Sequence, residues 1–154
     1  MLVYRLCRSN ILTNPLSAEG ACRRGGRWHP PGYPILYTSA TPELAVLEVT
    51  VHLEAESDTP PTYHLIVLEI PDECASVEEA HLPDDWRTEE HTEPLQTYLK
   101  DWLDNPHSLV MQVPSAVVSR SNNYLIHTGY PNFSNCVNVV EISPFELDGR
   151  LVKG

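Results

Sequence analysis

The stretch GGRWHPPGYPILYTSATPELAVLE, residues 25–48, sets the interpretation of the rest of the chain. Its two leading glycines favour a turn and would let the backbone approach a ligand closely. Residues 34–39 then form a short apolar run that predicts a strand carrying Tyr37. Thr41-Pro42 is a suitable start for a helix reaching about Leu53, with threonine as N-cap and proline in the first turn. The unit therefore brings an arginine, a tyrosine and a glutamate together.

The glutamate is Glu48, and its place on the predicted helix is unusual. At about 100° per residue, Leu44, Leu47 and Val51 form an apolar stripe, and Glu48 falls within it. A carboxylate on such a stripe is costly unless it is paired or faces a cavity. The structural alternative is a salt bridge to a buried arginine. The functional interpretation is that Glu48 belongs to a site.

Arg27 and Trp28 follow the glycines directly. Arginine is a rigid bidentate partner for phosphate. Tryptophan offers either a flat surface to a ligand or a plug for the core, and the second is favoured. The turn is neither a Walker loop nor a GxGxxG motif. Arg5 lies in a first predicted strand, where local sequence alone favours an outward, solvated side chain over one in a cleft.

Length and charge restrict the classes of function. With 154 residues, the chain is expected to form one domain spanning 1–154. A net charge of −11 argues against general affinity for nucleic acid or anionic membranes. Half of the ten basic residues lie near the N-terminus, which suits a small anionic ligand or an unevenly charged solvated surface. They are Arg5, Arg8, Arg23, Arg24 and Arg27.

Four cysteines without CxxC spacing and no long apolar run predict a cytoplasmic protein with reduced thiols, no structural metal and no membrane span. The remaining predicted elements are strands at 2–6, 63–70, 109–113, 116–118, 124–126 and 136–142, a helix at 93–103 and a polar loop at 119–123. Ser115 lies at a break between two of these strands, where a turn serine is favoured over a ligand contact. Strands outnumber helices, so the predicted class is α+β.

Taken together, these motifs resemble those of the RES-domain toxins of bacterial toxin–antitoxin pairs. The matching stretches are 3–5, 25–28, 34–39, 44–48, 113–118, 122–125, 144–145 and 150–151. The resemblance implies a compact fold like that of ADP-ribosyltransferases, with a split or mixed β-sheet core flanked by a few helices. It also implies NAD+ as substrate, degraded at the nicotinamide–ribose bond, and an Xre-like antitoxin as partner.

The resemblance assigns roles to particular residues. Arg27, Glu48 and Ser115 match the three name-giving positions, Tyr37 matches a tyrosine at the nicotinamide end, and Arg5 becomes a cleft residue. The expected catalytic set is thus Glu48, Arg27 and Tyr37. The expected NAD+ contacts are Arg5, Arg27, Trp28, Tyr37, Ser115 and Asn123. The chain departs from the family pattern at His29 and at 126–131, which leaves the support around Asn123 open.

The function expected from these residues is NAD+ glycohydrolysis or phosphorolysis. Glu48 would stabilise an oxocarbenium-like ribose, and no metal or further cofactor is required. One alternative is a mono-ADP-ribosyltransferase that modifies a cellular protein. Another is a module that binds a nucleotide without turnover. Nothing in the sequence settles whether the chain forms a homo-oligomer.

Overall fold

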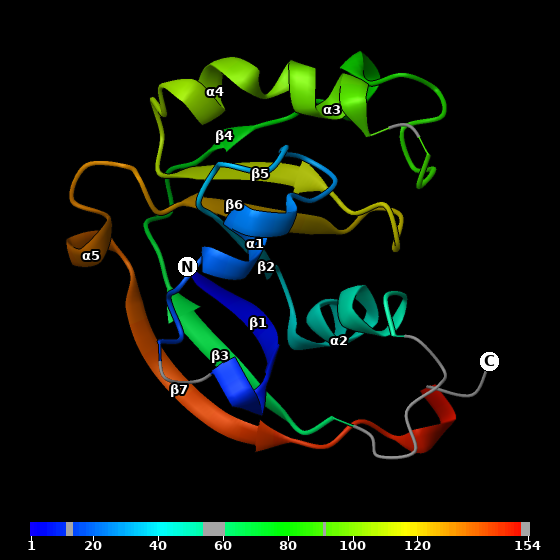
Figure 1. Cartoon of the computed structure of the whole chain (residues 1–154), viewed down its shortest axis with the longest axis vertical. Helices are drawn as coiled ribbons and strands as arrows, with labels where there is room; N and C mark the ends of the chain where they lie inside the picture. Colours follow the sequence, from blue (N-terminus) through cyan, green and yellow to red (C-terminus); the bar gives the residue numbers. More distant parts are fainter. Residues whose placement is uncertain (12–13, 54–60, 91, 152–154) are drawn as a thin grey trace.

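The computed structural model describes residues 1–11, 14–53, 61–90 and 92–151. Seven strands and a set of short helices alternate along the chain (Figure 1). The strands are β1 Leu2–Arg8, β2 Ile35–Ser39, β3 Tyr63–Glu69, β4 Ala75–Ser76, β5 Val110–Pro114, β6 Asn122–His127 and β7 Asn138–Phe145. The helices are η1 Ser9–Ile11, α1 Glu19–Arg24, α2 Pro42–Thr50, η2 Glu79–His81, α3 Glu93–Tyr98, α4 Lys100–Asp104, α5 Phe133–Cys136 and η3 Gly149–Leu151.

The strands form one mixed sheet in the order β4-β5-β6-β2-β1-β3-β7. Only β4 and β5 pair in parallel, and every other pair is antiparallel. The join between β1 and β2 is narrow, since it has a single registered pair, Tyr4 with Ser39. The sheet therefore has two halves, β4-β5-β6-β2 and β1-β3-β7. Their strands run in clearly different directions in Figure 1.

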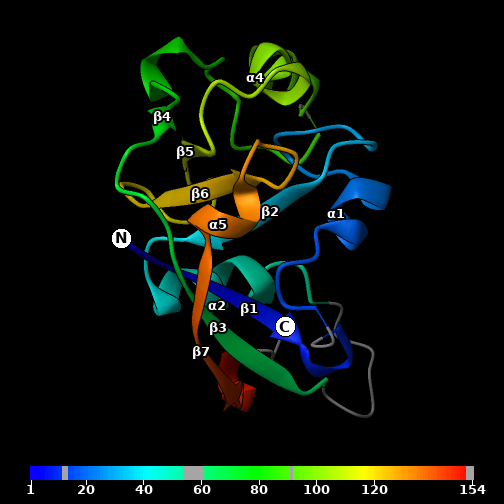
Figure 2. The ribbon, with the colours of Figure 1, turned by 90° about the vertical axis from the view of Figure 1, so that its left-hand side faces the viewer.

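Different segments cover the two halves on the face that carries Ile35, Tyr37 and Ser39. Over β1 and β3, α2 packs its Ala45 and Val46 against Leu6 and Tyr63. Over β2, β5 and β6 lies the segment from Val77 to Leu103, and this second cluster contains all three tryptophans. In Figures 1 and 2, α4 lies at one end of the molecule and β7 at the other. Glu48, Ser115 and Asn123 lie where α2 meets the segment from Val77 to Leu103.

The start of α2 confirms the predicted cap, because the Thr41 hydroxyl accepts a hydrogen bond from the backbone N–H of Leu44 at 3.1 Å. The predicted apolar stripe is wrong. Leu47 and Val51 are exposed, and the buried face of the helix is Leu44, Ala45 and Val46. The helix also ends at Thr50, before the predicted Leu53. Glu48 still faces the protein. On the helical wheel it lies about 40° from Leu44 in the direction of Ala45, so it falls between these two buried residues.

Three other predicted elements differ from the structure. The helix predicted at 93–103 is interrupted at Leu99, although its apolar side chains are buried except for Tyr98. The strand predicted at 116–118 is wrong, because the chain turns back there. The polar loop predicted at 119–123 ends early, since β6 begins at Asn122. Within the described residues, no helix has the length and apolar content that crossing a membrane requires.

Candidate functional site

Glu48 is the centre of a polar cluster at the junction of the two covers. Its Oε1 accepts hydrogen bonds from Ser115 Oγ at 2.7 Å and from Asn123 Nδ2 at 2.6 Å. The Asn123 side chain is held in turn, because its Oδ1 accepts from Ser39 Oγ at 2.8 Å. Both donors to the carboxylate are neutral, and no hydrogen bond among the described residues reaches Oε2. The predicted salt-bridge alternative is therefore not what holds Glu48 within this part of the chain.

Hydrogen bonds hold both the side chain and the backbone N–H of Ser115. Its Oγ accepts from the N–H groups of Val117 and Val118, at 3.1 and 3.0 Å, and its own N–H donates to Ser121 O at 2.8 Å. A hydroxyl has one donor and two acceptor positions, and all three are used here. The same bonds close the loop that reverses the chain between β5 and β6. Ser115 is only 1% exposed, so it holds the carboxylate and has no hydrogen-bonding capacity left for a ligand.

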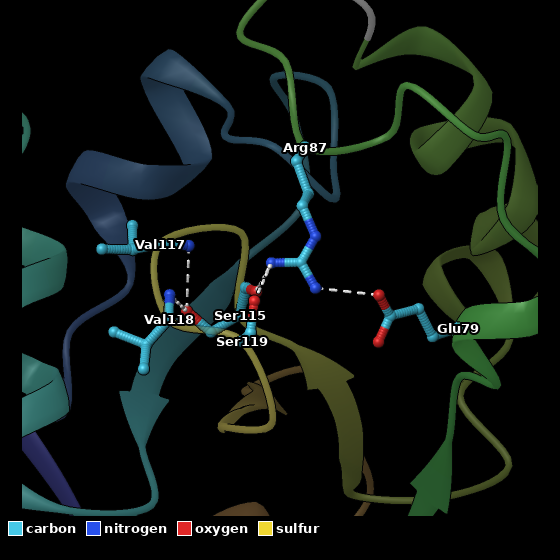
Figure 3. A network of polar contacts seen from close by, with 6 residues as sticks. All are labelled: Glu79, Arg87, Ser115, Val117, Val118 and Ser119. Carbon is cyan, nitrogen blue, oxygen red and sulfur yellow. Dashed lines mark hydrogen bonds and ion pairs between the residues drawn. The ribbon is translucent and has the colours of Figure 1, made fainter.

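Arg87 anchors this loop from the opposite segment (Figure 3). Its Nη1 donates to Ser119 Oγ at 3.3 Å and makes a long contact with Ser115 O at 3.5 Å. Its Nη2 forms an ion pair with Glu79 at 2.8 Å. The guanidinium also lies 4.7 Å from the ring centroid of Trp86. Arg87, the one lysine or arginine in the acidic stretch from Asp72 to Glu93, thus ties that stretch to the loop carrying Ser115.

Tyr37 lies on the same face of β2 as Ser39, two residues away, or about 7 Å along the strand. Its hydroxyl is 2.7 Å from His29 Nδ1 and accepts from the N–H of Trp28 at 3.3 Å. Burial raises the pKa of Tyr37 strongly, so the phenol is neutral. The hydroxyl is occupied by the protein, and the half-buried ring is the part of Tyr37 that remains for a ligand.

The glycine turn closes on this phenol. Gly25 has a φ of +71°, which suits glycine, and it follows the end of α1. A Cβ at Gly26 would lie 2.6 Å from the Tyr37 hydroxyl oxygen. The close approach that the glycines allow is therefore to Tyr37. The approach of the glycine backbone to a ligand stays a prediction.

Arg27 links the turn to the segment above the sheet. Its Nη1 donates to the carbonyl oxygens of Trp86 and Thr88, at 3.0 and 2.9 Å. The half-buried guanidinium lies near enough to Tyr37 for its positive charge to oppose, weakly, the rise that burial causes in the tyrosine's pKa. In the part of the chain that the structure describes, no carboxylate pairs with Arg27. Arg27 is thus a cation beside the phenol, held by backbone oxygens.

Trp28 and Arg5 have other roles than the predicted NAD+ contacts. Trp28 is 2% exposed and packs against Trp86 with ring centroids 6.1 Å apart, so it belongs to the core. Arg5 alternates with Tyr4 and Leu6, whose side chains pack in the cluster under α2, so it points to the opposite face of the sheet.

The Arg5 guanidinium hydrogen-bonds to the carbonyl oxygens of Pro15 and Ser17, at 3.3 and 3.4 Å. Burial lowers its pKa. Arg5 is therefore neither outwardly solvated nor in contact with the cluster around Glu48. The structure brings together Glu48, Ser115 and Asn123, with Tyr37 and Arg27 alongside.

The sequence analysis did not identify three residues that support the site. Ser39 holds Asn123, His29 contacts Tyr37, and Arg87 contacts the loop that carries Ser115. The period-2 pattern of β2 could have indicated Ser39, since it shares a face with Tyr37. The other two depend on contacts between distant segments that no local pattern carries. Two surface hollows lie elsewhere, one lined by Met1, Glu69–Asp72, Cys136 and Asn138, the other by residues 146–149. Neither hollow is lined by Glu48, Ser115, Asn123 or Tyr37, so the polar network defines the candidate site.

Within the described residues, no group of three or more His, Cys, Asp or Glu side chains is arranged to hold a metal ion. All four cysteines are free thiols.

The sequence profile of the RES domain matches residues 2–148. The chain belongs to the RES-domain toxins. It is 33% identical over 154 residues to "Toxin Res" of Photorhabdus laumondii, covering 99% of this chain and 98% of that protein. It is 30% identical over 142 residues to the "Prs ADP-ribosylating toxin" of a Sphingobium species, covering 90% and 87%.

The fold has a solved counterpart. It matches a chain in the crystal structure of the M. tuberculosis MbcT–MbcA toxin–antitoxin complex with a TM-score of 0.74 and 20% identity. The match covers 94% of this chain and 83% of that one. The α+β fold of this chain is therefore similar to that of a chain solved in a toxin–antitoxin complex.

Proposed function

We propose that this RES-domain chain cleaves NAD+ at the nicotinamide–ribose bond. One observation carries the proposal: the Glu48 carboxylate is held through one oxygen by two neutral donors, Ser115 and Asn123, beside the ring of Tyr37. A charge held in this way costs little reorganisation when positive charge develops next to it. The pairing suits a reaction in which a ribose becomes cationic.

The chemistry needs few groups. The C–N bond breaks, and nicotinamide leaves with the bonding electron pair as a neutral molecule, so no acid is needed to protonate it. Positive charge then develops on the ribose, as in glycoside hydrolysis, and Glu48 stabilises it. Water as acceptor gives ADP-ribose and a proton, while inorganic phosphate gives a phosphorylated ADP-ribose.

The neighbouring residues divide the remaining work. The ring of Tyr37 forms a wall for nicotinamide, and Arg27 supplies a cation for the pyrophosphate. Ser115 and Asn123 position Glu48: the Ser115 hydroxyl has no hydrogen-bonding position left for the substrate, and one of the two N–H groups of the Asn123 amide is committed to the carboxylate. This assignment changes the role that the sequence resemblance implies for both residues.

A second candidate has its own support. The Sphingobium relative is named an ADP-ribosylating toxin, which favours transfer of the ADP-ribosyl group to a protein side chain. The same carboxylate would serve, since only the acceptor differs. Biotinylated NAD+ would then label a target protein in a cell extract.

We also propose a cognate antitoxin as partner, because the matched fold was solved in a toxin–antitoxin complex. An Xre-like protein is the expected kind. Co-expression with a candidate antitoxin should give a stable complex and restore growth.

The deciding assay is nicotinamide release from NAD+ by the purified chain, with water, phosphate and protein acceptors offered in turn. Release that depends on Glu48 supports the proposal. Binding of NAD+ without release under any acceptor would instead identify a non-catalytic nucleotide module.

A further inference from the structure

Among the described residues, His29 is the one fully buried ionisable side chain next to the candidate site, with 0% exposure. The proposed reaction gives it no role. Its ring contacts Tyr37 tilted, with the two centroids 5.4 Å apart. Both ring nitrogens have hydrogen-bond partners. An imidazole bonded at both nitrogens can hold its partners in fixed positions.

The tautomer follows from these partners. Nε2 lies 3.0 Å from the carbonyl oxygen of Ala21, which can only accept, so Nε2 carries the proton. In the neutral ring, Nδ1 is then an acceptor, and the Tyr37 hydroxyl donates to it across 2.7 Å. Burial lowers the pKa of His29, which favours this neutral form. The hydrogen bonds thus run in one direction, from the Tyr37 hydroxyl through His29 to the carbonyl oxygen of Ala21 in α1.

These hydrogen bonds fix the tyrosine ring from one side while the glycine turn limits it from the other. The hydroxyl is tied to His29 and to the Trp28 N–H, and Gly26 leaves no space in which the phenol could shift toward the turn. Because the phenol oxygen lies on the long axis of the ring, holding it limits where the ring lies and how far it tilts. Since a phenol O–H prefers the plane of its ring, the bond from this O–H to His29 Nδ1 also favours one rotation of the ring about that axis. The orientation of the ring face is therefore set largely by the imidazole.

We propose that His29 is a positioning residue, which acts through the Tyr37 hydroxyl to hold the tyrosine ring at the angle that the nicotinamide end of the substrate requires. The inference rests on the proposed NAD+ cleavage and deepens it. It assigns His29 a role through one acceptor atom, Nδ1, and not through its charge or its volume.

Two amide substitutions separate that atom from the rest of the ring. In His29→Asn, the amide oxygen takes approximately the place of Nδ1 and can accept from Tyr37, while the bond to Ala21 is lost. In His29→Gln, the amide N–H takes approximately the place of Nε2 and can donate to Ala21, while Tyr37 loses its acceptor. Each variant removes one hydrogen bond of the same buried residue, so each is a control for the other.

The experiment measures kcat and KM for nicotinamide release together with thermal unfolding, for both variants in the wild-type and Tyr37→Phe backgrounds. We expect similar losses of Tm for the two variants. We expect kcat to fall about tenfold or more for His29→Gln, because a misplaced group weakens catalysis steeply, and to stay near wild type for His29→Asn. In the Tyr37→Phe background, the difference between Asn and Gln should disappear, since there is no hydroxyl left to accept from.

The other outcomes are distinct. Equal kcat values for His29→Asn and His29→Gln, or a difference that persists in Tyr37→Phe, would overturn the positioning role while leaving NAD+ cleavage intact. Absence of release by the wild-type protein under every acceptor would overturn the proposed function itself. The His29 variants therefore test the positioning role, and the wild-type protein tests NAD+ cleavage, in the same assay.

Discussion

Two polar networks lie side by side on one face of the sheet, one around Glu48 and one around Tyr37. In the first, neutral donors converge on one carboxylate oxygen and leave the charge in place. In the second, a buried imidazole and a backbone N–H occupy the hydroxyl and leave the ring. The contrast teaches that the first network presents a charge and the second a surface. In each network the hydrogen bonds hold one end of a side chain, Oε1 of Glu48 or the hydroxyl of Tyr37, and leave the rest of the group for the substrate.

Removing the charge should have the largest effect. Glu48→Gln keeps the shape of the side chain but removes the negative charge, and NAD+ cleavage should fall by about 100-fold or more. Glu43→Gln is the matched control, because that exposed glutamate lies in the first turn of the same helix. Steady-state nicotinamide release checks both. Activity in Glu48→Gln close to that of Glu43→Gln would show that the first network does not act through its charge.

Loosening the charge should matter less than removing it. Ser115→Ala takes away one donor to Glu48 and the acceptor of two loop N–H groups, and we expect about a tenfold loss of kcat at little change in KM. Ser119→Ala, in the same loop, removes only a partner of Arg87 and should retain activity. A KM that rises while kcat holds would mean that Ser115 binds substrate, against the positioning role.

Displacing the surface should weaken substrate binding in addition to any loss of kcat. Gly26→Ala places a methyl group against the Tyr37 hydroxyl and displaces the ring, so KM for NAD+ should rise several-fold. Gly149→Ala meets no neighbouring atom within 4 Å and serves as its control. Titrating NAD+ at fixed enzyme concentration measures the difference. An unchanged KM in Gly26→Ala would separate the tyrosine ring from substrate binding.

The smallest expected effect is on stability as a function of pH. Since burial lowers the pKa of folded His29, the unfolded chain binds more protons as pH falls through the ordinary histidine pKa of about 6.5. The free energy of unfolding should therefore decrease on acidification below that pH. His29→Asn should show a shallower decrease in urea unfolding between neutral and mildly acidic pH. Parallel pH profiles for the two proteins would contradict a buried neutral imidazole.

The sequence predicted the local parts of this arrangement well. The strand ending near Tyr37, the Thr41 cap and the inward direction of Glu48 all follow from short-range rules. The reason offered for Glu48 was nevertheless incorrect, because Leu47 and Val51 are exposed and the helix buries a different face. The inward direction of Glu48 was still predicted correctly. Glu48 lies close to Leu44 on the helical wheel, and Leu44 belongs to both the predicted and the observed buried face.

The misses have a common physical cause. Asn123 was assigned to a loop because polar residues interrupt an apolar pattern, but it lies in β6, where Ser39 on a neighbouring strand satisfies its side chain. Arg5 and Trp28 were placed at the site because arginine and tryptophan suit nucleotides. Their side chains are instead committed to carbonyl oxygens behind the sheet and to the core. Such commitments depend on segments far away in the chain.

The narrow join between β1 and β2 has a consequence for when activity can arise during synthesis. Glu48 is attached through α2 to one half of the sheet, whereas both of its donors come from the other half, beyond residue 114. A ribosome that has released only the first 110 residues has made the carboxylate but neither group that holds it. Under the proposed function, the chain therefore stays harmless until Ser115 and Asn123 have been made and have folded against Glu48.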